Sequence, residues 1–342
     1  MKIDDLEMYV IKTPVRIAFG GGGTDVEPYS SDYGGYVINT TINVYFRCIL
    51  TKREDNLINI YSNDKFFPYK FDTIEILNTK GQISNLFEAI LYLMKPKSGM
   101  DVYVHGEPLK KAGLGASASL CTCLISGILK IEEKAIDIDD ISEKAYYVEQ
   151  NIIKNVGGRQ DQYASVYGGF NSLEFLGDSN VNVEKLNISK PFKQKIEENL
   201  ILFYTGEPHI SGNMVKEQVK SYMEHKETSK KLLDKLKDLA YQMRDSILSE
   251  DFERFGELLS EDLKYKTKFN PLLTTNYMKE LNRLILNNGG IGGRVCGAGG
   301  GGCMIWLVKP NSKKKISELL LNQQGKLIEF KFTHKGLEIS EV

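Results

Sequence analysis

The sequence predicts an α+β fold divided into two domains, and three observations support that prediction. Its 342 residues are enough for two domains that share an interface. The first part is rich in strand patterns interrupted by apolar helical stretches. From Asn199 onwards, strand and helix patterns follow in the order βα(α)ββαβ, which is the split βαβ arrangement. We therefore expect a domain boundary near residue 195, with domains at residues 1–195 and 196–342.

Runs of β-branched and aromatic residues predict the strands of the first domain, and apolar residues at helical spacing predict its helices. The expected strands are residues 9–19, 36–52, 57–62 and 101–106. The expected helices are residues 83–94, 120–131 and 140–155. The last helix begins at the Asp139-Asp140 pair and ends at Gly157-Gly158, because acidic residues favour a helix start and glycine favours a helix end.

A strand over residues 199–205 opens the second domain, and a long, lysine-rich helical stretch follows it. Five apolar residues share one face of that stretch and predict an amphipathic helix packed on a core: Leu232, Leu236, Leu239, Met243 and Ile247. The remaining pattern predicts strands at residues 293–298, 303–308 and 327–333, with a helix at residues 312–322.

Composition argues against several classes of protein. Lys and Arg number 44 against 45 Asp and Glu, so the chain lacks the basic field that nucleic-acid binding needs. No apolar stretch approaches the length of a membrane span, and the first residues lack a signal-peptide pattern. The five cysteines lack C-x-x-C spacing, so we expect core residues rather than zinc ligands. We expect a cytoplasmic monomer or homodimer that acts on small molecules.

The most informative segment is a glycine and hydroxyl loop, residues 111–119, between the strand at 101–106 and the helix at 120–131. Unpaired amides and the positive end of the helix dipole favour a bound anion at such a position. Gly113 and Gly115 let the backbone pass close to a ligand, while Ser117 and Ser119 offer hydroxyls. The loop predicts a phosphate seat, and the alternative is an ordinary serine-capped helix.

Glu149 lies on the predicted helix at residues 140–155 among apolar neighbours, namely Ala145, Ile152 and Ile153. A carboxylate in such surroundings needs a partner. Magnesium would be one partner, held also by the Ser117 hydroxyl and by phosphate oxygens. A salt bridge to a lysine or arginine is the other interpretation, and the sequence leaves both open.

Asp161 follows the Gly157-Gly158 turn and is the best candidate for a general base. The alternative is that it caps the next helical turn. Arg16 stands alone in an otherwise apolar strand, and a buried arginine needs an anion. Arg16 could hold Asp161 ionised, screen charge at a transferred phosphoryl group, or pair structurally.

Two further glycine clusters predict ligand loops. Four glycines at residues 20–23 precede Thr24 and Asp25, which places Asp25 to accept hydrogen bonds from a polyol. The other cluster, residues 289–302, ends in Gly297-Ala298-Gly299-Gly300-Gly301-Gly302 between two predicted strands. It predicts a ligand-closing loop or, alternatively, a tight hairpin packed against the other domain.

Residues 14–25, 108–119 and 297–302 resemble, in that order, the three sequence motifs of the GHMP small-molecule kinases. Glu149 and Asp161 lie between the second and third motifs, and the resemblance spans almost the whole chain. It implies a GHMP kinase two-domain fold, in which an N-terminal domain like domain 2 of ribosomal protein S5 precedes a ferredoxin-like domain. It also implies ATP and Mg²⁺ as cofactors.

The resemblance further implies a role for each motif residue. Asp161 would be the catalytic base, assisted by Arg16, while Ser117 and Glu149 would hold magnesium. The nucleotide phosphates would bind the second motif, which comprises Lys111, Gly113, Leu114, Gly115, Ala116, Ser117, Ala118 and Ser119. The acceptor would contact Gly22, Gly23, Thr24, Asp25, Arg159, Gly299 and Gly300.

Within the family, residues 16–25, 158–163 and 204–206 are most similar to bacterial kinases that phosphorylate C1 of a heptose 7-phosphate for surface polysaccharide precursors. Gly22-Gly23 replaces the Glu-His pair that galactokinases carry before Thr-Asp, which argues against a galactokinase. The 7-phosphate has three basic candidates, Lys110, Lys111 and Arg159. Another sugar 1-kinase, of the fucose or hexosamine type, is the alternative within the family.

Two interpretations come from other classes of protein. Gly113-x-Gly115-x-x-Ala118 also fits the dinucleotide fingerprint of nicotinamide-dependent oxidoreductases. That fingerprint requires a tight turn directly after the strand, whereas residues 106–112 intervene here. A non-catalytic sugar sensor would lack Asp161 or Glu149, and both are present. The kinase interpretation is therefore favoured over both, and the resemblance implies that the acceptor is a phosphorylated heptose.

Overall fold

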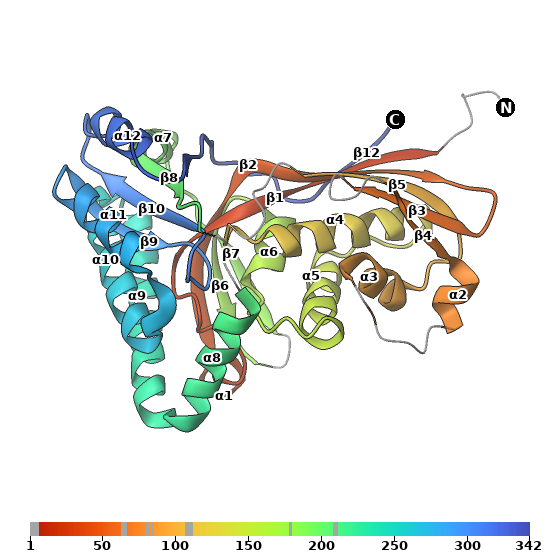
Figure 1. The fold of residues 1–342 in the computed structure, drawn as a ribbon, viewed down its shortest axis with the longest axis horizontal. Coiled ribbons are helices and arrows are strands. Elements are labelled where there is room, and N and C mark those ends of the chain that lie inside the picture. Colours follow the sequence, from red (N-terminus) through yellow and green to blue (C-terminus); the bar gives the residue numbers. More distant parts are fainter. Residues whose placement is uncertain are drawn as a thin grey trace.

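The computed structural model describes residues 7–62, 67–78, 83, 85–106, 112–177, 180–207 and 211–342, which form two β-sheets with helices packed on them (Figure 1). The larger sheet has the strand order β12-β1-β2-β5-β3-β4, and β6 joins β2 to β7. Its strands are β1 (Met8–Gly20), β2 (Gly35–Lys52), β3 (Leu57–Ser62), β4 (Tyr69–Asp72), β5 (Met100–Gly106), β6 (Phe170–Phe175), β7 (Val181–Lys185) and β12 (Glu338–Glu341).

β1 and β2 form a long antiparallel hairpin that crosses the molecule (Figure 1). The register shifts between Pro14 and Val15, where proline has no N–H group for the ladder. The first half of β2 pairs with β6 and its second half with β5, so one strand belongs to both halves of the sheet. β1 ends at Gly20 and leads directly into the glycine loop of residues 20–25.

Helix α4 (Ala116–Ile131) is the central helix of the first domain, and it packs against β1 and β2. Most of its residues are buried, because α3 (Leu86–Met94), α5 (Ile138–Tyr147) and α6 (Gln160–Tyr167) also contact it. These helices lie on one face of the larger sheet (Figure 1). The apolar run after the glycine loop is thus a helix covered on several sides, as its composition predicts.

The second sheet has the antiparallel order β11-β8-β10-β9, which confirms the split βαβ arrangement and the ferredoxin-like domain. Its strands are β8 (Leu200–Tyr204), β9 (Gly290–Val295), β10 (Cys303–Val308) and β11 (Lys326–Leu327). The helices of this part are α7 (Lys190–Asn199), α8 (Ser211–Glu224), α9 (Lys226–Leu248), α10 (Phe252–Phe269), α11 (Asn276–Leu286) and α12 (Lys313–Leu321), with a short 3₁₀ turn, Pro271–Leu273. None of the helices in the described ranges is long and apolar enough to cross a membrane.

β10 is buried on both of its faces. Met304 and Trp306 face a cluster with residues of α11 and α12, whereas Ile305 and Leu307 join a second cluster that also contains Ile17 of β1. This second cluster further includes residues of α9 and α10. A single apolar core therefore connects the two sheets, and all five cysteines are buried and free, as expected.

The structure differs from the predicted elements at three places. The helix predicted at residues 140–155 is split, because α5 ends at Tyr147 and a π-helical turn, Val148–Ile152, follows it. The predicted strand at 327–333 ends at Leu327, and the chain then returns to the larger sheet, where Phe332 bridges Ile42 and β12 pairs with β1. The sequence patterns also did not predict the short elements α1 (Tyr29–Tyr33), α2 (Thr73–Asn78), α6, α7, β4, β6, β7 and β12.

Candidate active site

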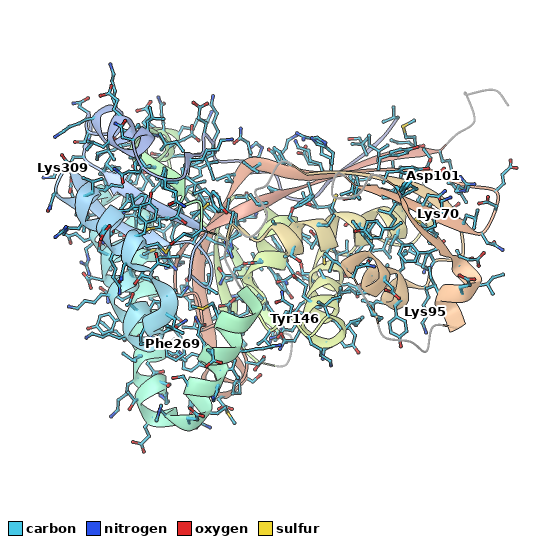
Figure 2. All side chains as sticks on the ribbon, in the orientation of Figure 1. Lys70, Lys95, Asp101, Tyr146, Phe269 and Lys309 are labelled. Carbon is cyan, nitrogen blue, oxygen red and sulfur yellow. The ribbon has the colours of Figure 1, made fainter. Side chains whose placement is uncertain are left out.

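A cavity of about 330 Å³ lies where the loops of the two domains meet. The segment before α4 lines it with residues 112–118, and the loop after β1 lines it with Gly22, Gly23 and Asp25. The second domain contributes Val215 and Gln218 of α8, Lys266 of α10, and Gly297 and Ala298. Tyr146 of α5, which is labelled in Figure 2, lines the same cavity.

The glycine turn before α4 has the backbone of an anion cradle. Gly113 and Gly115 have φ angles of 75° and 73°, which only glycine adopts without strain. The hydrogen bond from Ser119 N to Gly115 O opens the helical ladder, so the amides of residues 116–118 precede it and lie at the cavity. A Cβ atom on Gly113 would lie 2.6 Å from the carbonyl oxygen of Cys296, which shows how tightly the second domain holds this turn.

Arg16 connects β1 to both the glycine turn and Asp161. Its Nε donates to Asp161 Oδ1 at 2.7 Å, and Nη2 lies 2.7 Å from the same oxygen. Its Nη1 donates to the carbonyl oxygen of Gly113 at 2.6 Å, while its backbone N–H donates to Leu114 O at 3.0 Å. The Arg16 side chain is 5% exposed and that of Asp161 is 26% exposed. Asp161 is therefore held by a buried cation and still reaches the cavity.

Glu149 lies on the π-helical turn and is 8% exposed. Burial raises the pKa of its carboxyl group to about 7, and Asp161 adds to this rise, whereas hydrogen bonds from Ser117 and Gln162 oppose it. Gln162 Nε2 donates to Glu149 Oε2 at 2.7 Å. Among the residues that the structure describes, no lysine or arginine forms an ion pair with Glu149. Within the described residues Glu149 therefore lacks a basic partner for a salt bridge. The oxygen donors that a magnesium ion would need, the Glu149 carboxylate and the Ser117 hydroxyl, are present.

The raised pKa of Glu149 predicts a pH-dependent effect on stability. The pKa is about 7 in the folded protein against 4.5 ordinarily, so the destabilisation by this carboxyl group grows as the pH rises above about 4.5 and is complete above about 7. Without metal at pH 8, Glu149→Gln should raise the free energy of unfolding by about 1–3 kcal/mol, and the gain should shrink as the pH falls and vanish near about pH 4. Urea unfolding in a chelator at both pH values measures this. The exposed Glu280→Gln is the control, and an equal gain at both pH values would contradict the prediction.

Asp25 is 1% exposed and accepts hydrogen bonds from Gly23 N at 3.0 Å and from Gln160 Nε2 at 3.0 Å. Burial raises the pKa of its carboxyl group. A Cβ atom on Gly158 would lie 1.9 Å from Asp25 Oδ2, so the turn before Asp161 can pack on this carboxylate only because residue 158 is glycine. Gln160 Oε1 is buried without a protein partner in the described chain. Asp25 and Gln160 together therefore form a polar wall that suits hydroxyl groups.

Several residues that the sequence assigns to the site make structural contacts instead of lining the cavity. Ser119 is buried, and its hydroxyl lies 3.0 Å from that of Thr13 on β1. The Thr24 hydroxyl donates to Gly21 O at 2.7 Å within the loop. Gly299 and Gly300 pack against Leu273, with Gly300 N donating to Leu273 O at 2.8 Å.

Arg159 also lies outside the cavity lining. Its Nη1 is 2.9 Å from Glu27 Oε1, its Nε is 3.3 Å from Glu143 Oε1, and the guanidinium carbon lies 4.2 Å from the centre of the Tyr146 ring. Its charge is therefore paired with two carboxylates. Lys111, also assigned to the site, lies outside the described residues, as does Lys110.

The polar residues of the cavity that were not predicted from the sequence include Gln160, Gln218 and Lys266. Gln218 is 5% exposed, and its Nε2 has no hydrogen-bond partner in the described chain. Lys266 is 5% exposed, although it lies in a lysine-rich helix whose Lys264 and Lys268 face solvent. The sequence does not distinguish Lys266 from the other lysines of α10 unless the buried face of that helix is known. No sequence pattern distinguishes Gln218 from the other polar residues of its helix.

Phosphoryl transfer to a hydroxyl group needs an anion cradle, a cation and a group that orients or deprotonates the acceptor. The fold and this combination of groups in one cavity define a phosphotransferase that uses ATP and an alcohol acceptor. The family model described as the GHMP kinases N-terminal domain matches residues 83–169, and the GHMP kinases C-terminal model matches residues 243–326. The chain belongs to the GHMP kinases.

Known proteins similar to this chain include several sugar kinases. The D-glycero-alpha-D-manno-heptose 7-phosphate kinase of Campylobacter jejuni is 29% identical over 339 residues, which cover 96% of this chain and 97% of the relative. A solved D-glycero-D-manno-heptose 1-phosphate kinase of Bacteroides thetaiotaomicron has a TM-score of 0.81 at 23% identity, covering 98% of this chain and 99% of that one. A solved galactokinase of Lactococcus lactis has a TM-score of 0.78 at 19% identity, covering 98% of this chain and 95% of the galactokinase chain. The last two share the fold.

Proposed function

We propose that the protein transfers the terminal phosphoryl group of ATP to the C1 hydroxyl of D-glycero-D-manno-heptose 7-phosphate, giving the 1,7-bisphosphate. The observation that carries this proposal is Asp161, held by Arg16 in the cavity that also contains the glycine turn and Asp25. The names of the Campylobacter and Bacteroides relatives support a glycero-manno-heptose as the acceptor. The product would serve as a precursor of activated heptose for surface polysaccharides.

The chain's own residues divide the work of the reaction. The amides before α4 and the dipole of that helix would bind the phosphates of the nucleotide. Asp161 would accept the proton of the C1 hydroxyl as that oxygen attacks phosphorus. Arg16 fixes the position of the Asp161 carboxylate, because its Nε and Nη2 both lie 2.7 Å from Asp161 Oδ1. Catalysis would then come from positioning and charge rather than from a covalent intermediate.

Ser117 and Glu149 are the residues that would hold Mg²⁺. Glu149 is a buried carboxylate whose pKa is raised to about 7, and the hydroxyl of Ser117 forms a hydrogen bond with it, so both ligands already lie together. One carboxylate and one hydroxyl, completed by phosphate oxygens and water, suit the oxygen coordination of Mg²⁺. When bound, the ion would neutralise charge on the nucleotide phosphates.

The acceptor would lie against Asp25 and Gln160 on one side and against α8 on the other. Asp25 accepts hydrogen bonds, and Gln160 Oε1 is a buried acceptor without a protein partner in the described chain. Gln218 offers an unpaired donor from α8. These three side chains suit the several hydroxyl groups of a sugar. For the 7-phosphate, Arg159 would have to exchange Glu27 or Glu143 for the substrate, since both carboxylates pair with it.

ADP release over a panel of acceptors tests the proposed function. We expect heptose 7-phosphate to exceed unphosphorylated heptose, fucose, galactose, mannose and N-acetylhexosamines by at least about 100-fold in kcat/KM, the difference that about 3 kcal/mol of selective binding produces. Omitting the acceptor measures the background of ATP hydrolysis. Turnover of a hexose or fucose without turnover of heptose 7-phosphate would overturn the heptose assignment and leave a GHMP kinase with another sugar.

A further inference from the structure

Lys266 brings a cation from the second domain into the cavity. It lies on α10, is 5% exposed and lines the cavity together with Gly22 and Gly297. Its Nζ donates to the carbonyl oxygen of Gly297 at 2.9 Å. An ammonium group has three donors, so this bond leaves two for another group. Burying a lysine is costly unless a partner compensates its charge, so its burial here indicates an anionic ligand.

The other positive charges nearby are already paired. In the described part of the lining, Arg16 and Lys266 are the cations, and Arg16 is paired with Asp161. Arg294 of β9 lies outside the lining, and its Nη1 is 3.1 Å from Asp262 Oδ2, without the alignment of a hydrogen bond. No carboxylate of the described chain forms an ion pair with Lys266. Lys266 is thus the cation of the described lining that is left for a ligand.

The backbone contacts of Lys266 place it beside the glycine turn. Gly297, whose carbonyl oxygen accepts its hydrogen bond, packs directly on Gly113, because a Cβ on Gly297 would lie 3.0 Å from Gly113 Cα. The carbonyl oxygen of Gly113 accepts the hydrogen bond from Arg16. A Cβ on Gly22 would lie 3.2 Å from Lys266 Nζ and 3.5 Å from Gln160 Nε2, and Gln160 precedes Asp161. Lys266 is therefore close to the point where the phosphate cradle, the base and the acceptor loop meet.

We propose that Lys266 is a catalytic residue whose ammonium group contacts the phosphoryl group as it passes from ATP to the acceptor. This inference rests on the proposed roles of Asp161 and the glycine turn. The acceptor oxygen forms a bond to phosphorus, its proton passes to Asp161, and the bond to the leaving oxygen of ADP breaks. Lys266 stays protonated throughout and stabilises the negative charge on the oxygens of the transferred group.

The surroundings of Lys266 give this role a pH signature. Burial lowers the pKa of its ammonium group to about 8, and Arg294 and Arg16 lower it further, while Asp262 and Asp25 oppose the change. The charge of Lys266 also interacts with the Cys296 thiol, whose pKa burial raises to about 11. In the enzyme without ligands, Lys266 should therefore lose its charge as the pH rises through about 8.

Three variants test the inference: Lys266→Met, Lys266→Arg and the exposed control Lys264→Met. Each is assayed with the acceptor that gives the highest turnover in the panel. We expect Lys266→Met to lower kcat by about 50-fold, the value of one charge-assisted hydrogen bond, and to leave the affinity for ATP within about threefold. Lys264→Met should match the wild type. Thermal unfolding of each variant shows whether it folds.

The pH profile separates catalysis from a structural role for the bond to Gly297. In the wild type, kcat/KM should fall above about pH 8, and in Lys266→Arg this fall should disappear, because arginine stays charged. This comparison decides the matter even if the methionine variant does not fold. An unchanged alkaline limb in Lys266→Arg, or a kcat within threefold of the wild type in a folded Lys266→Met, would overturn the inference. Turnover of a sugar other than heptose would overturn the heptose assignment only.

Discussion

Asp161→Asn is expected to lower kcat by about 10³-fold, the typical contribution of a positioned general base. The amide is nearly isosteric, and its oxygen can still accept from Arg16, so the local geometry should persist. It cannot take a proton from the acceptor hydroxyl. The affinity for ATP, measured by calorimetry, should stay within about threefold of the wild type, because the role proposed for Asp161 concerns the acceptor and not the nucleotide.

The matched control for this variant is Asp238→Asn, since Asp238 is an exposed aspartate of α9 remote from the cavity lining. It should retain wild-type kcat. If Asp161→Asn were as active as this control, Asp161 would have no role in proton transfer. If both kcat and ATP affinity fell strongly, the aspartate would instead support the glycine turn, through the contact that Gly115 makes with it.

Arg16→Lys should lower kcat by about 300-fold, although the charge is kept. The guanidinium group reaches two partners at once, Asp161 through Nε and Nη2 and the Gly113 carbonyl oxygen through Nη1. A single ammonium group can satisfy only one of them well. We also expect a loss of about 1–3 kcal/mol in the free energy of unfolding, because one of these buried partners is left without its bond.

The double variant Arg16→Lys with Asp161→Asn shows whether the two residues act as a unit. Once the base is absent, correct positioning of residue 161 no longer matters, so the combined loss of kcat should be far smaller than the product of the two single losses. Steady-state kinetics of the four proteins measure this. Losses that multiply would show that Arg16 serves the nucleotide and not Asp161.

The elements that the sequence predicts well are those whose own residues determine them. The two long strands of the hairpin, the apolar helix after the glycine turn and β10 are all marked by long, periodic or continuously apolar patterns. β7 and β12 are short and largely polar, and they form because β6 and β1 offer them a partner. The predicted strand at 327–333 is mostly a connection between the sheets, which no local pattern reveals.

The candidate site follows the same division. Asp161, Arg16 and the glycine turn belong to compact motifs, and the structure brings them together. Arg159 was expected to contact the acceptor, but its partner Glu27 is 132 residues away in the sequence, so the pairing is visible only in three dimensions. Lys266 and Gln218 were missed for the converse reason, because burial by another domain distinguishes them from the many polar residues of their helices.

The core shared by the two sheets has a consequence for how the protein unfolds. Ile17 of β1 and Ile305 of β10 belong to one cluster, and Arg16 is the neighbour of Ile17. Cooperative units of unfolding coincide with contiguous packed cores rather than with divisions of the chain. Heat or denaturant should therefore melt both domains in one transition, and a cavity made in β10 should also disturb the packing beside Arg16. Partial unfolding that spares the active site would have to begin outside this shared core.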